Sequence, residues 1–291
     1  MAQFNFKAIG TSWQIDIYQD IDEKKETEIF SKIKDRIEIF ESNYSRFRDN
    51  SIVTQISKED AKGKTFELPA DAEKMLNLYR ELYDLTDGFF TPLVGNLLSD
   101  AGYDAKYSLE KKRELTAPPT WEEALEYHHP KLLIKKPALL DFGAAGKGYI
   151  IDIVGGLLED NNIFEYCIDA GGDILYKNKT PMRIGLENPE DVVQVIGVYT
   201  LNNGALCGSA GNRRAWGKFN HIMNPKTLES ATEIIAVWVN SERAMLADAL
   251  TTCLFFVPSK ILQEHYKFEY CLLRKDFSIE KSENFSDEFF S

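Results

Sequence analysis

The strongest constraint on the fold is a run of strand-like segments that are separated by turns and not by helices. A parallel, doubly wound sheet needs a crossover helix between successive strands, so this run favours antiparallel meanders in a fold of the α+β class. The four segments are EYCIDAGGDILY (165–176), MRIGLE (182–187), VIGVYTLNNGALCGSA (195–210) and TEIIAVWVN (232–240).

Helical periodicity is found on both sides of these strands. Apolar residues recur at helical spacing over about 21–40, and a second amphipathic pattern covers 68–88. The segment 138–160 predicts a short strand, a glycine-rich turn and a helix that starts near Lys147. A last helix is predicted over 244–256, where apolar residues are spaced to bury one face.

Two other segments are interpreted from alternation and composition. SWQIDIY (12–18) alternates apolar and polar residues, which predicts a half-buried strand. Residues 101–136 are polar and irregular, and we expect an excursion or a joint between subdomains there. His128 and His129 lie in this segment and are expected to be solvated surface residues.

Length and charge limit the possible functions. The 291 residues suffice for one large domain or two intimate ones, and we predict a single domain over 1–291. A net charge of −12 makes nucleic acids and anionic membranes poor first candidates as partners. No segment approaches the roughly 20 apolar residues of a membrane span, and the N-terminus lacks the apolar core of a signal peptide. We expect a cytoplasmic protein; the alternative is an exported lipoprotein whose leader has been removed.

The four cysteines give no metal signature. They are widely spaced, and none belongs to a CxxC or Cys/His pattern. We therefore expect buried free thiols, which suit a reducing compartment. The residues are Cys167, Cys207, Cys253 and Cys271.

The last predicted helix carries an unusual polar pair. Asp248 and Thr252 are four residues apart, so their side chains share one face of the helix. A carboxylate and a hydroxyl together offer two hard oxygen ligands of the kind that Mg²⁺ takes with water and phosphate oxygens. The alternative is that Asp248 caps or pairs locally and that Thr252 bonds back to the carbonyl four residues earlier.

A second candidate lies in DFGAAGKGY (141–149), which has three glycines and places Lys147 at a helix start. Glycines let a phosphate approach the backbone, helix N-terminal amides favour anions, and lysine adds a positive charge. The segment matches neither GxGxxG nor the Walker A pattern, and a plain tight turn is the alternative. Gly171 and Gly172 are likewise explained by a tight turn or a bulge between strands.

Two further residues could take part in chemistry. His221 is one of four histidines and is a candidate base because its unperturbed pKa is roughly 6.5, while a structural histidine is the alternative. Phe47 lies in the hydroxyl-rich segment ESNYSRFRDNS (41–51) and could stack on a flat ligand ring. An ordinary turn with one buried ring accounts for Phe47 equally well.

Taken in order, nine segments resemble the ApbE family, the FAD:protein FMN transferases. The resemblance covers nearly the whole chain, and it implies an α+β fold of two interleaved halves with FAD bound between them. The nine segments are GTSWQIDIY, SRFRDNS, TDGFFTPLVGNLL, LDFGAAGKGYIID, IDAGGDIL, MRIGLENP, LCGSAGNRR, HIMNPKT and ADALTT.

The resemblance also implies an activity. Proteins of this family use Mg²⁺ to cleave the pyrophosphate of FAD and attach FMN to a threonine or serine hydroxyl of a partner, releasing AMP. The implied partner is a flavin-carrying subunit of a redox complex or of a fumarate-reductase-like enzyme. This chain has no acceptor motif of its own, so it resembles the transferase. The alternatives are an FAD pyrophosphatase and a non-catalytic flavin-binding protein.

The family's functional residues fall on specific positions of this chain. The resemblance implies a magnesium site made of Asp248, Thr252 and the backbone carbonyl of Gly146. It implies Asp248 and His221 as catalytic residues, with His221 as the base for the acceptor hydroxyl. The residues that it places near the flavin nucleotide are Phe47 at the ring, Lys147, Gly171, Gly172, Ser209 and His221.

The sequence departs from the family pattern at several loop positions. Thr91 and Leu93 stand where an aspartate and a threonine are usual, and Leu228 stands where glycine is usual. The usual Thr-Ser-Gly is Gly-Ser-Ala over 208–210, and Ser57 replaces a loop asparagine. These changes concern the substrate loops and the balance between transfer and hydrolysis more than they concern metal binding.

Overall fold

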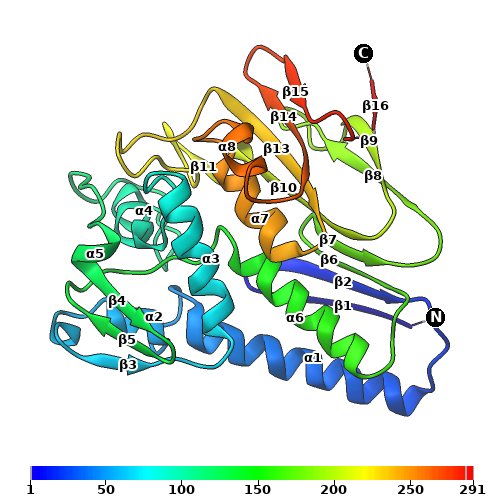
Figure 1. Cartoon of the computed structure of the whole chain (residues 1–291), viewed down its shortest axis with the longest axis horizontal. Coiled ribbons are helices and arrows are strands. Elements are labelled where there is room, and N and C mark those ends of the chain that lie inside the picture. The colour runs from blue at the N-terminus through cyan, green and yellow to red at the C-terminus, as the bar shows by residue number, and fades with distance from the viewer. Residues whose placement is uncertain (1, 286, 291) are drawn as a thin grey trace. The chain divides into compact units, whose positions relative to one another are not determined.

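The computed structural model describes residues 2–285 and 287–290, which form two compact units. Unit 1 consists of the residues up to Ile39, Ala144–Arg213 and the residues from Thr232 onward. Unit 2 consists of Phe40–Gly143 and Arg214–Ala231. Each unit contains helices and strands (Figure 1), so the predicted α+β class with two interleaved halves is confirmed. The single domain over 1–291 and the position of the FAD site between the halves stay predictions.

Unit 1 is built on an eight-stranded sheet in which every pair of neighbouring strands is antiparallel. The antiparallel meander predicted from the sequence is therefore present. In spatial order the strands are β1 (Ala2–Ala8), β2 (Thr11–Ile17), β6 (Tyr166–Ala170), β7 (Asp173–Lys177), β10 (Gly204–Ala210), β13 (Ile234–Ser241), β14 (Glu269–Arg274) and β15 (Ile279–Lys281).

The remaining elements of unit 1 are helices and a small sheet. Helix α1 (Glu23–Tyr44) starts in unit 1 and packs on β1, where Phe30 stacks on Phe4 with ring centroids 4.7 Å apart. The other helices are α6 (Gly146–Asp160), α7 (Ala244–Cys253) and α8 (Ser259–Gln263). The small sheet has the order β16 (Asp287–Phe289), β9 (Val195–Leu201) and β8 (Met182–Glu187).

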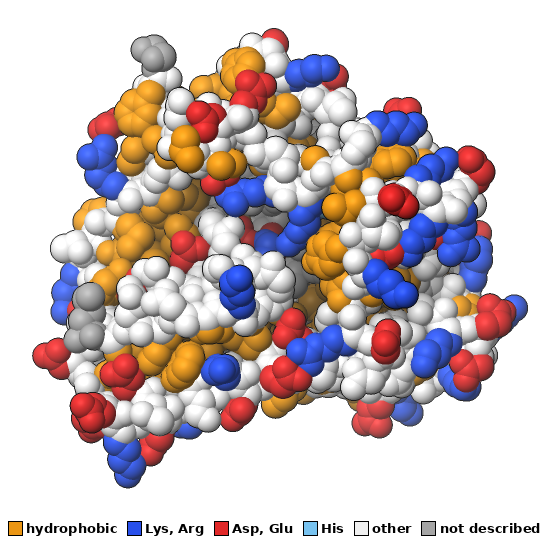
Figure 2. Space-filling view, turned by 180° about the vertical axis from the view of Figure 1, so that it is seen from behind, with side chains coloured by type: hydrophobic (Ala, Val, Ile, Leu, Met, Phe, Trp, Pro, Cys, Tyr) orange, Lys and Arg blue, Asp and Glu red, His pale blue; other side chains and the backbone are white. Residues whose placement is uncertain are grey.

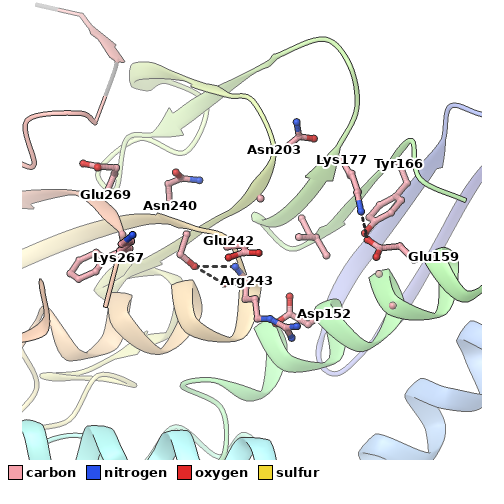
Figure 3. A pocket seen from close by; sticks show the side chains of 16 residues that line it. Asp152, Glu159, Tyr166, Lys177, Asn203, Asn240, Glu242, Arg243, Lys267 and Glu269 are labelled. Atoms are coloured by element: carbon pink, nitrogen blue, oxygen red, sulfur yellow. Dashed lines mark hydrogen bonds and ion pairs between the residues drawn. The ribbon is translucent and has the colours of Figure 1, made fainter. Parts of the chain in front are cut away.

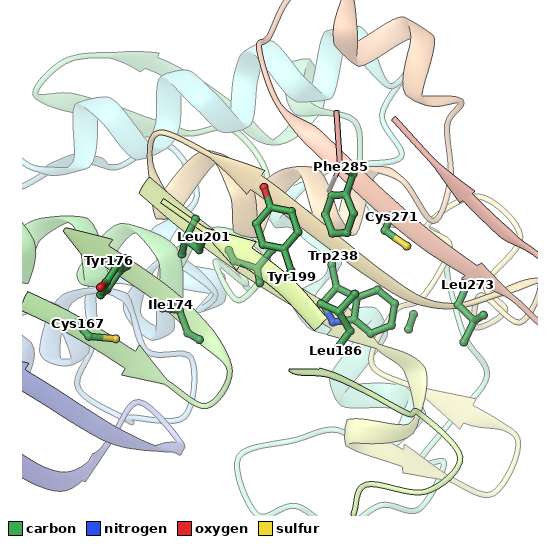
Figure 4. Close-up of a cluster of buried hydrophobic side chains, with 12 residues drawn as sticks. Cys167, Ile174, Tyr176, Leu186, Tyr199, Leu201, Trp238, Cys271, Leu273 and Phe285 are labelled. Atoms are coloured by element: carbon green, nitrogen blue, oxygen red, sulfur yellow. The ribbon is translucent and has the colours of Figure 1, made fainter. Parts of the chain in front are cut away.

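The two faces of the large sheet are covered differently. Consecutive residues of a strand point to opposite faces. Cys207 Sγ lies 3.6 Å from the Ala244 carbonyl of α7, whereas Leu206 belongs to a core cluster with residues of β8 and β9. Helices α6 and α7 therefore cover one face, and the small sheet packs on the other (Figure 4).

Unit 2 is a second α+β arrangement. Its core cluster joins the end of α4 to the short β11–β12 hairpin, and Trp216 Nε1 donates a hydrogen bond to the Ala101 carbonyl (2.8 Å). The helices are α2 (Ile52–Ile56), α3 (Ala72–Leu85), α4 (Gly95–Ala101) and α5 (Trp121–Ala124). The strands are β3 (Thr65–Glu67), β5 (Lys131–Ile134) and β4 (Leu125–His128) in one sheet, and β11 (Ala215–Trp216) with β12 (Phe219–Asn220) in another.

Two local predictions are wrong. The short strand expected near 138–142 does not form. Its backbone makes other contacts, because Asp141 N donates a hydrogen bond to the Pro92 carbonyl (2.7 Å). The backbone of Gly95 also lies against this segment, since a Cβ atom on Gly95 would be 2.2 Å from the Leu139 carbonyl oxygen. The segment 101–136 is also more regular than expected, since it contains α5 and the β4–β5 hairpin.

Other expectations are confirmed. All four cysteines are buried and form no disulfide within the described residues, and His128 and His129 are exposed. Among the residues that the structure describes, no helix combines the length and the apolar character needed to span a membrane. On the face shown in Figure 2, acidic and basic side chains are interspersed, so the negative net charge is spread out on that face.

Helices α6 and α7 approach each other most closely at Gly148. A Cβ atom on Gly148 would lie 2.1 Å from the Ala244 carbonyl oxygen and 2.8 Å from Asp248 Cβ. Carbon atoms in van der Waals contact are about 3.5–4.0 Å apart, so no larger residue fits without moving a helix. The glycine thus fixes how near Asp248 comes to the start of α6.

We predict that Gly148→Ala lowers the free energy of unfolding by about 1–3 kcal/mol, because the two helices must separate. Gly156→Ala in the same helix is the matched control, since its Cβ would meet no atom within 4 Å. That change should raise the free energy of unfolding by roughly 0.5–1 kcal/mol. Urea unfolding measures both, and a Gly148→Ala variant as stable as the wild type would contradict the close packing.

Candidate functional site

The predicted site residues are divided between the two units. Phe47 and His221 lie in unit 2. The others, Gly146, Lys147, Gly171, Gly172, Ser209, Asp248 and Thr252, lie in unit 1.

In unit 1 the structure brings three charged side chains together. Lys147 is the second residue of α6, and its ammonium forms an ion pair with Asp173 Oδ2 and lies 3.1 Å from Asp248 Oδ1. The two carboxylates are almost fully buried, with 1% of Asp173 and 2% of Asp248 exposed. One lysine therefore links the start of α6 to both β7 and α7.

Backbone amides complete the contacts of both carboxylates. Gly148 N donates to Asp248 Oδ2 (2.9 Å), and Gly208 N donates to Asp173 Oδ1 (3.1 Å). Since each carboxylate has one oxygen on the lysine and the other on a glycine amide, its orientation is fixed. Glycine at 148 and 208 allows the backbone to come this near, because added Cβ atoms would meet neighbours at 2.1 Å and 3.1 Å.

The charge states of this cluster follow from burial and from mutual attraction. Burial raises the pKa of Asp248 to about 7, the Lys147 ammonium opposes this rise, and the Asp173 carboxylate adds to it. Burial also disfavours the ammonium, but Asp173 and Asp248 outweigh it and raise the pKa of Lys147 above its usual value. When Asp248 is ionised, the two carboxylates and the one ammonium carry a net negative charge, which favours a second cation nearby.

Asp173 was not predicted as a site residue. It is the first residue of β7 and directly follows the Gly171–Gly172 turn, where both φ values are positive (69° and 93°). Positive φ at both loop residues is the geometry of a type I′ hairpin, so the alternative of a tight turn is correct for the two glycines. The sequence did contain a signal for Asp173, because a residue that directly follows a two-glycine turn is held at the start of the next strand.

The two threonines of α7 have different roles. Thr251 is fully buried, and its hydroxyl donates to the Asp248 carbonyl (2.6 Å) and bonds with Ser209 Oγ (2.8 Å). Thr252 is partly exposed, and within the described residues its hydroxyl makes no hydrogen bond. Within the described residues, Thr252 does not make the expected alternative bond to the carbonyl four residues earlier, whereas Thr251 bonds to the carbonyl three residues earlier. The Thr252 hydroxyl is therefore available as a metal ligand.

The three proposed metal ligands are of a chemical type that suits a hard cation. Among the residues that the structure describes, no three His, Cys, Asp or Glu side chains are grouped as in a typical metal cluster. What Asp248, Thr252 and Gly146 can offer is a carboxylate, a hydroxyl and a carbonyl, all of them oxygen donors. Mg²⁺ is bound by one or two carboxylates with waters and phosphate oxygens, so this donor set suits Mg²⁺ better than Zn²⁺.

In unit 2, Phe47 lies within a group of aromatic rings around a buried arginine. The Arg46 guanidinium lies over the rings of Phe47 (4.3 Å) and Tyr103 (4.7 Å) and forms an ion pair with Asp141. The Phe47 ring also stacks on Tyr107, with ring centroids 5.4 Å apart. The packing favours the alternative of an ordinary packed ring, and Tyr107, which is 48% exposed, is the outer ring of the group.

Arg46 also offers a donor for a ligand. Its Nη2 atom is buried and has no hydrogen-bond partner in the described part of the chain. A buried unpaired donor costs about 1–3 kcal/mol, so a polar group that bonds to it would recover that free energy. Sequence reasoning missed this residue because its burial depends on Tyr103 and Asp141, which are distant along the chain.

His221 follows strand β12 in a loop whose shape is set by its own hydrogen bonds. His221 N donates to the Arg214 carbonyl (3.1 Å), and Asn220 Oδ1 accepts a bond from Ile222 N (2.8 Å). His221 as a whole is partly exposed, whereas its Nδ1 atom is buried. The two hydrogen bonds hold the backbone on both sides of His221.

The residues that depart from the family pattern have local roles in the backbone of their loops. Thr91 caps the short helix after it, since its side chain accepts a bond from Leu93 N (3.2 Å) as an aspartate would. Leu228 has a φ of +63°, a region that favours glycine, so its backbone keeps the conformation of the residue that it replaces. Ser57 Oγ donates to the Thr54 carbonyl (2.8 Å) at the end of α2.

Comparisons with known proteins point to one family. The model of the ApbE family matches residues 9–270. An FAD:protein FMN transferase from Rhodobacter capsulatus is 27% identical over 67% of this chain, which spans 40% of that protein's length. One from Haemophilus influenzae is 25% identical over 93% of this chain and 86% of its own. The solved flavin transferase ApbE from Vibrio cholerae has the same fold, with a TM-score of 0.81 at 21% identity over 98% of this chain and 97% of its own.

We predict that Lys147→Met lowers the free energy of unfolding by about 3–5 kcal/mol, because it leaves two buried carboxylates without their cation. Lys135→Met is the control, since Lys135 pairs with Glu126 (3.1 Å) at an exposed position and should contribute less than about 1 kcal/mol. Chemical unfolding at neutral pH compares the two. Equal losses of stability would show that the buried lysine does not hold the carboxylates together.

Proposed function

The chain belongs to the ApbE family, and from this premise we propose that it transfers the FMN moiety of FAD to a hydroxyl group of a partner protein and releases AMP. The observation that carries the proposal is the buried Asp248 carboxylate, held beside the glycine-rich start of α6 by Lys147 and by Gly148 N. Relatives named FAD:protein FMN transferase support flavin transfer as the activity.

We propose that Asp248, Thr252 and the Gly146 carbonyl hold Mg²⁺. Bound there, the ion would neutralise the pyrophosphate and the charge that develops on the departing AMP. The acidic chain makes such neutralisation necessary, since a pyrophosphate brings about two further negative charges to a protein of net charge −12. The hydroxyl of Thr252, which makes no hydrogen bond within residues 2–285 and 287–290, and the oxygen-only donor set support this assignment.

Lys147 has a more specific role than phosphate binding in this proposal. Its ammonium pairs with Asp173 and Asp248, so it acts first on the carboxylates. By keeping the two negative side chains in one arrangement, it positions Asp248 without movement of α7. Asp173 joins the site for the same reason, as the second partner of the lysine.

His221 serves as the base in this proposal. Its imidazole would take the proton from the acceptor threonine or serine, whose oxygen then bonds to the FMN phosphorus as the bond to the AMP oxygen breaks. The proton passes from the imidazole to solvent or to the leaving phosphate. The proposed contacts of the flavin nucleotide stay Phe47, Lys147, Gly171, Gly172, Ser209 and His221. A flavin-carrying subunit of a redox complex or of a fumarate-reductase-like enzyme stays the proposed acceptor.

One assay separates transfer from its alternatives. The protein is incubated with FAD, Mg²⁺ and a domain that carries the Asp-Gly-Thr/Ser-Gly-Ala-Thr type of acceptor motif, and in-gel flavin fluorescence is read together with AMP release. A fluorescent acceptor with one AMP per flavin supports transfer. AMP without labelled acceptor assigns hydrolysis, and neither product contradicts both enzymatic functions.

Replacing the proposed metal hydroxyl tests the magnesium site. We predict that Thr252→Val raises the Mg²⁺ concentration for half-maximal activity at least about tenfold, because one oxygen ligand is lost while the shape of the side chain is kept. Thr27→Val is the control, since Thr27 lies at an exposed position of α1, where its Oγ1 donates to the Glu23 carbonyl (2.9 Å). Direct Mg²⁺ titration calorimetry gives a second readout, and unchanged Mg²⁺ binding by Thr252→Val would remove Thr252 from the ligand set.

Removal of the proposed base should slow the transfer reaction and leave FAD binding largely unchanged. We predict that His221→Ala lowers the transfer rate about 10²–10⁴-fold, the usual contribution of a positioned base. FAD affinity, measured by fluorescence quenching, should change less than about threefold, and added imidazole should restore part of the rate. Wild-type rates in this variant would exclude His221 as the base.

A further inference from the structure

Figure 3 shows a cavity of about 690 Å³ in unit 1, and several of the charged side chains that line it already have partners. Lys177 Nζ lies 2.9 Å from Glu159 Oε1, and Asp152 Oδ1 accepts a hydrogen bond from Ala244 N (2.9 Å) at the start of α7. Groups that are paired in this way do not require a ligand. The surroundings of Arg46 in unit 2 differ, because they contain a buried donor without a partner.

Arg46 uses only part of its hydrogen-bonding capacity within the protein. Its side chain is 3% exposed, and Nε donates to Asp141 Oδ2. Its Nη2 atom is buried and has no hydrogen-bond partner among residues 2–285 and 287–290. Asp141 already supplies the opposite charge, and a second buried anion would have to give up its hydration without a second cation. The remaining donor therefore suits a neutral acceptor, such as a carbonyl oxygen.

Arg46 and Tyr107 contact the same two aromatic rings. The guanidinium carbon of Arg46 lies 4.3 Å from the ring centroid of Phe47 and 4.7 Å from that of Tyr103. The Tyr107 centroid lies 5.4 Å from each of these two rings, and the planes of Tyr107 and Phe47 differ by only 19°. A flat group in the place of the Tyr107 ring would therefore stack on Phe47 and lie near Arg46.

The ring of Tyr107 can turn outward while its backbone stays in place. Asp104 Oδ1 accepts hydrogen bonds from Lys106 N (2.8 Å) and Ser108 N (3.1 Å), which hold the backbone on both sides of Tyr107. The Tyr107 side chain is 48% exposed, and exposed side chains change rotamer rapidly. A rotation of this side chain into solvent would uncover Phe47 without unfolding the loop between α4 and α5 (Figure 1).

We propose that the flavin ring system of FAD displaces Tyr107, stacks on Phe47 in its place and accepts a hydrogen bond from Arg46 Nη2. This inference rests on the proposed function, which makes FAD the substrate. The flavin ring system is flat and carries two carbonyl oxygens on its pyrimidine ring, so it matches both the stacking position and the donor. Its three fused rings are longer than the ring of tyrosine and extend from Phe47 towards Arg46. Arg46 thus favours binding of the flavin, and Tyr107 competes with it.

Fluorescence titration of the full chain with FAD and Mg²⁺ tests the competition. Tyr107→Ala should bind FAD about three- to tenfold more tightly, because the competing ring no longer reduces the fraction of molecules that can take the flavin. Weaker binding would make Tyr107 itself the stacking platform. That result, equal binding, or no binding of FAD by the wild type would overturn the proposal.

Phe277→Ala is the matched control for this variant. Phe277 is 51% exposed and lies in unit 1, and its φ of +63° resembles the +51° of Tyr107. Its replacement should leave the FAD affinity within about twofold, as is usual for a surface change away from a site. An equal gain of affinity in this control would contradict a specific role of Tyr107.

The donor is tested by Arg46→Lys, which keeps a cation for Asp141 and removes Nη2. This variant should bind FAD at least about tenfold more weakly, since a hydrogen bond from a charged group is lost. Its affinity for ADP, which has no flavin, should equal that of the wild type by calorimetry. Equal losses for FAD and ADP, or no loss for FAD, would contradict Arg46 as the donor. Thermal unfolding reports whether the variant is folded, and if it is not, Tyr107→Ala decides the proposal.

The acceptor-labelling assay separates this inference from the proposed function. Labelled acceptor together with wild-type FAD affinities in Tyr107→Ala and Arg46→Lys overturns the inference and leaves flavin transfer standing. The predicted changes of affinity without labelled acceptor or AMP support the inference and contradict the proposed function.

Discussion

The arrangement of unit 1 around the site depends on one ammonium group. Lys147 is buried between Asp173 and Asp248, and without it these carboxylates would carry like charge in a medium that solvates neither. The ion pairs connect a helix start, a strand start and the middle of a second helix. The same contact that stabilises the packing therefore also orients the carboxylate on which the proposed metal site depends.

Glycines make this contact possible by removing side chains where backbone must approach. The backbone amides of Gly148 and Gly208 donate hydrogen bonds to the two carboxylates. The absence of a side chain at these positions lets the amides come close enough to do so. The Gly171–Gly172 turn starts β7 at Asp173. The backbone hydrogen bonds to the two carboxylates thus come from residues that have no side chains.

Much of this was predictable from local pattern, and the remainder depends on contacts between distant residues. Helical spacing located α1, α3, α6 and α7, and the order of motifs pointed to Asp248 and Thr252 as the proposed metal ligands. The strand expected near 138–142 failed because Asp141 and Leu139 pack against Pro92 and Gly95, which no local pattern reveals. Asp173 and Arg46 were missed for the same reason, since each gains its role only from partners brought near by the fold.

The chain passes between the two units at four places, after Ile39, Gly143, Arg213 and Ala231. A single cut therefore cannot release either unit intact and free of the other, and a gene fragment with one new end encodes pieces of both. To make unit 1 alone, two separate excisions and two new peptide joins would be needed. Because their segments alternate along the chain, the two units are synthesised, folded and degraded as parts of one polypeptide.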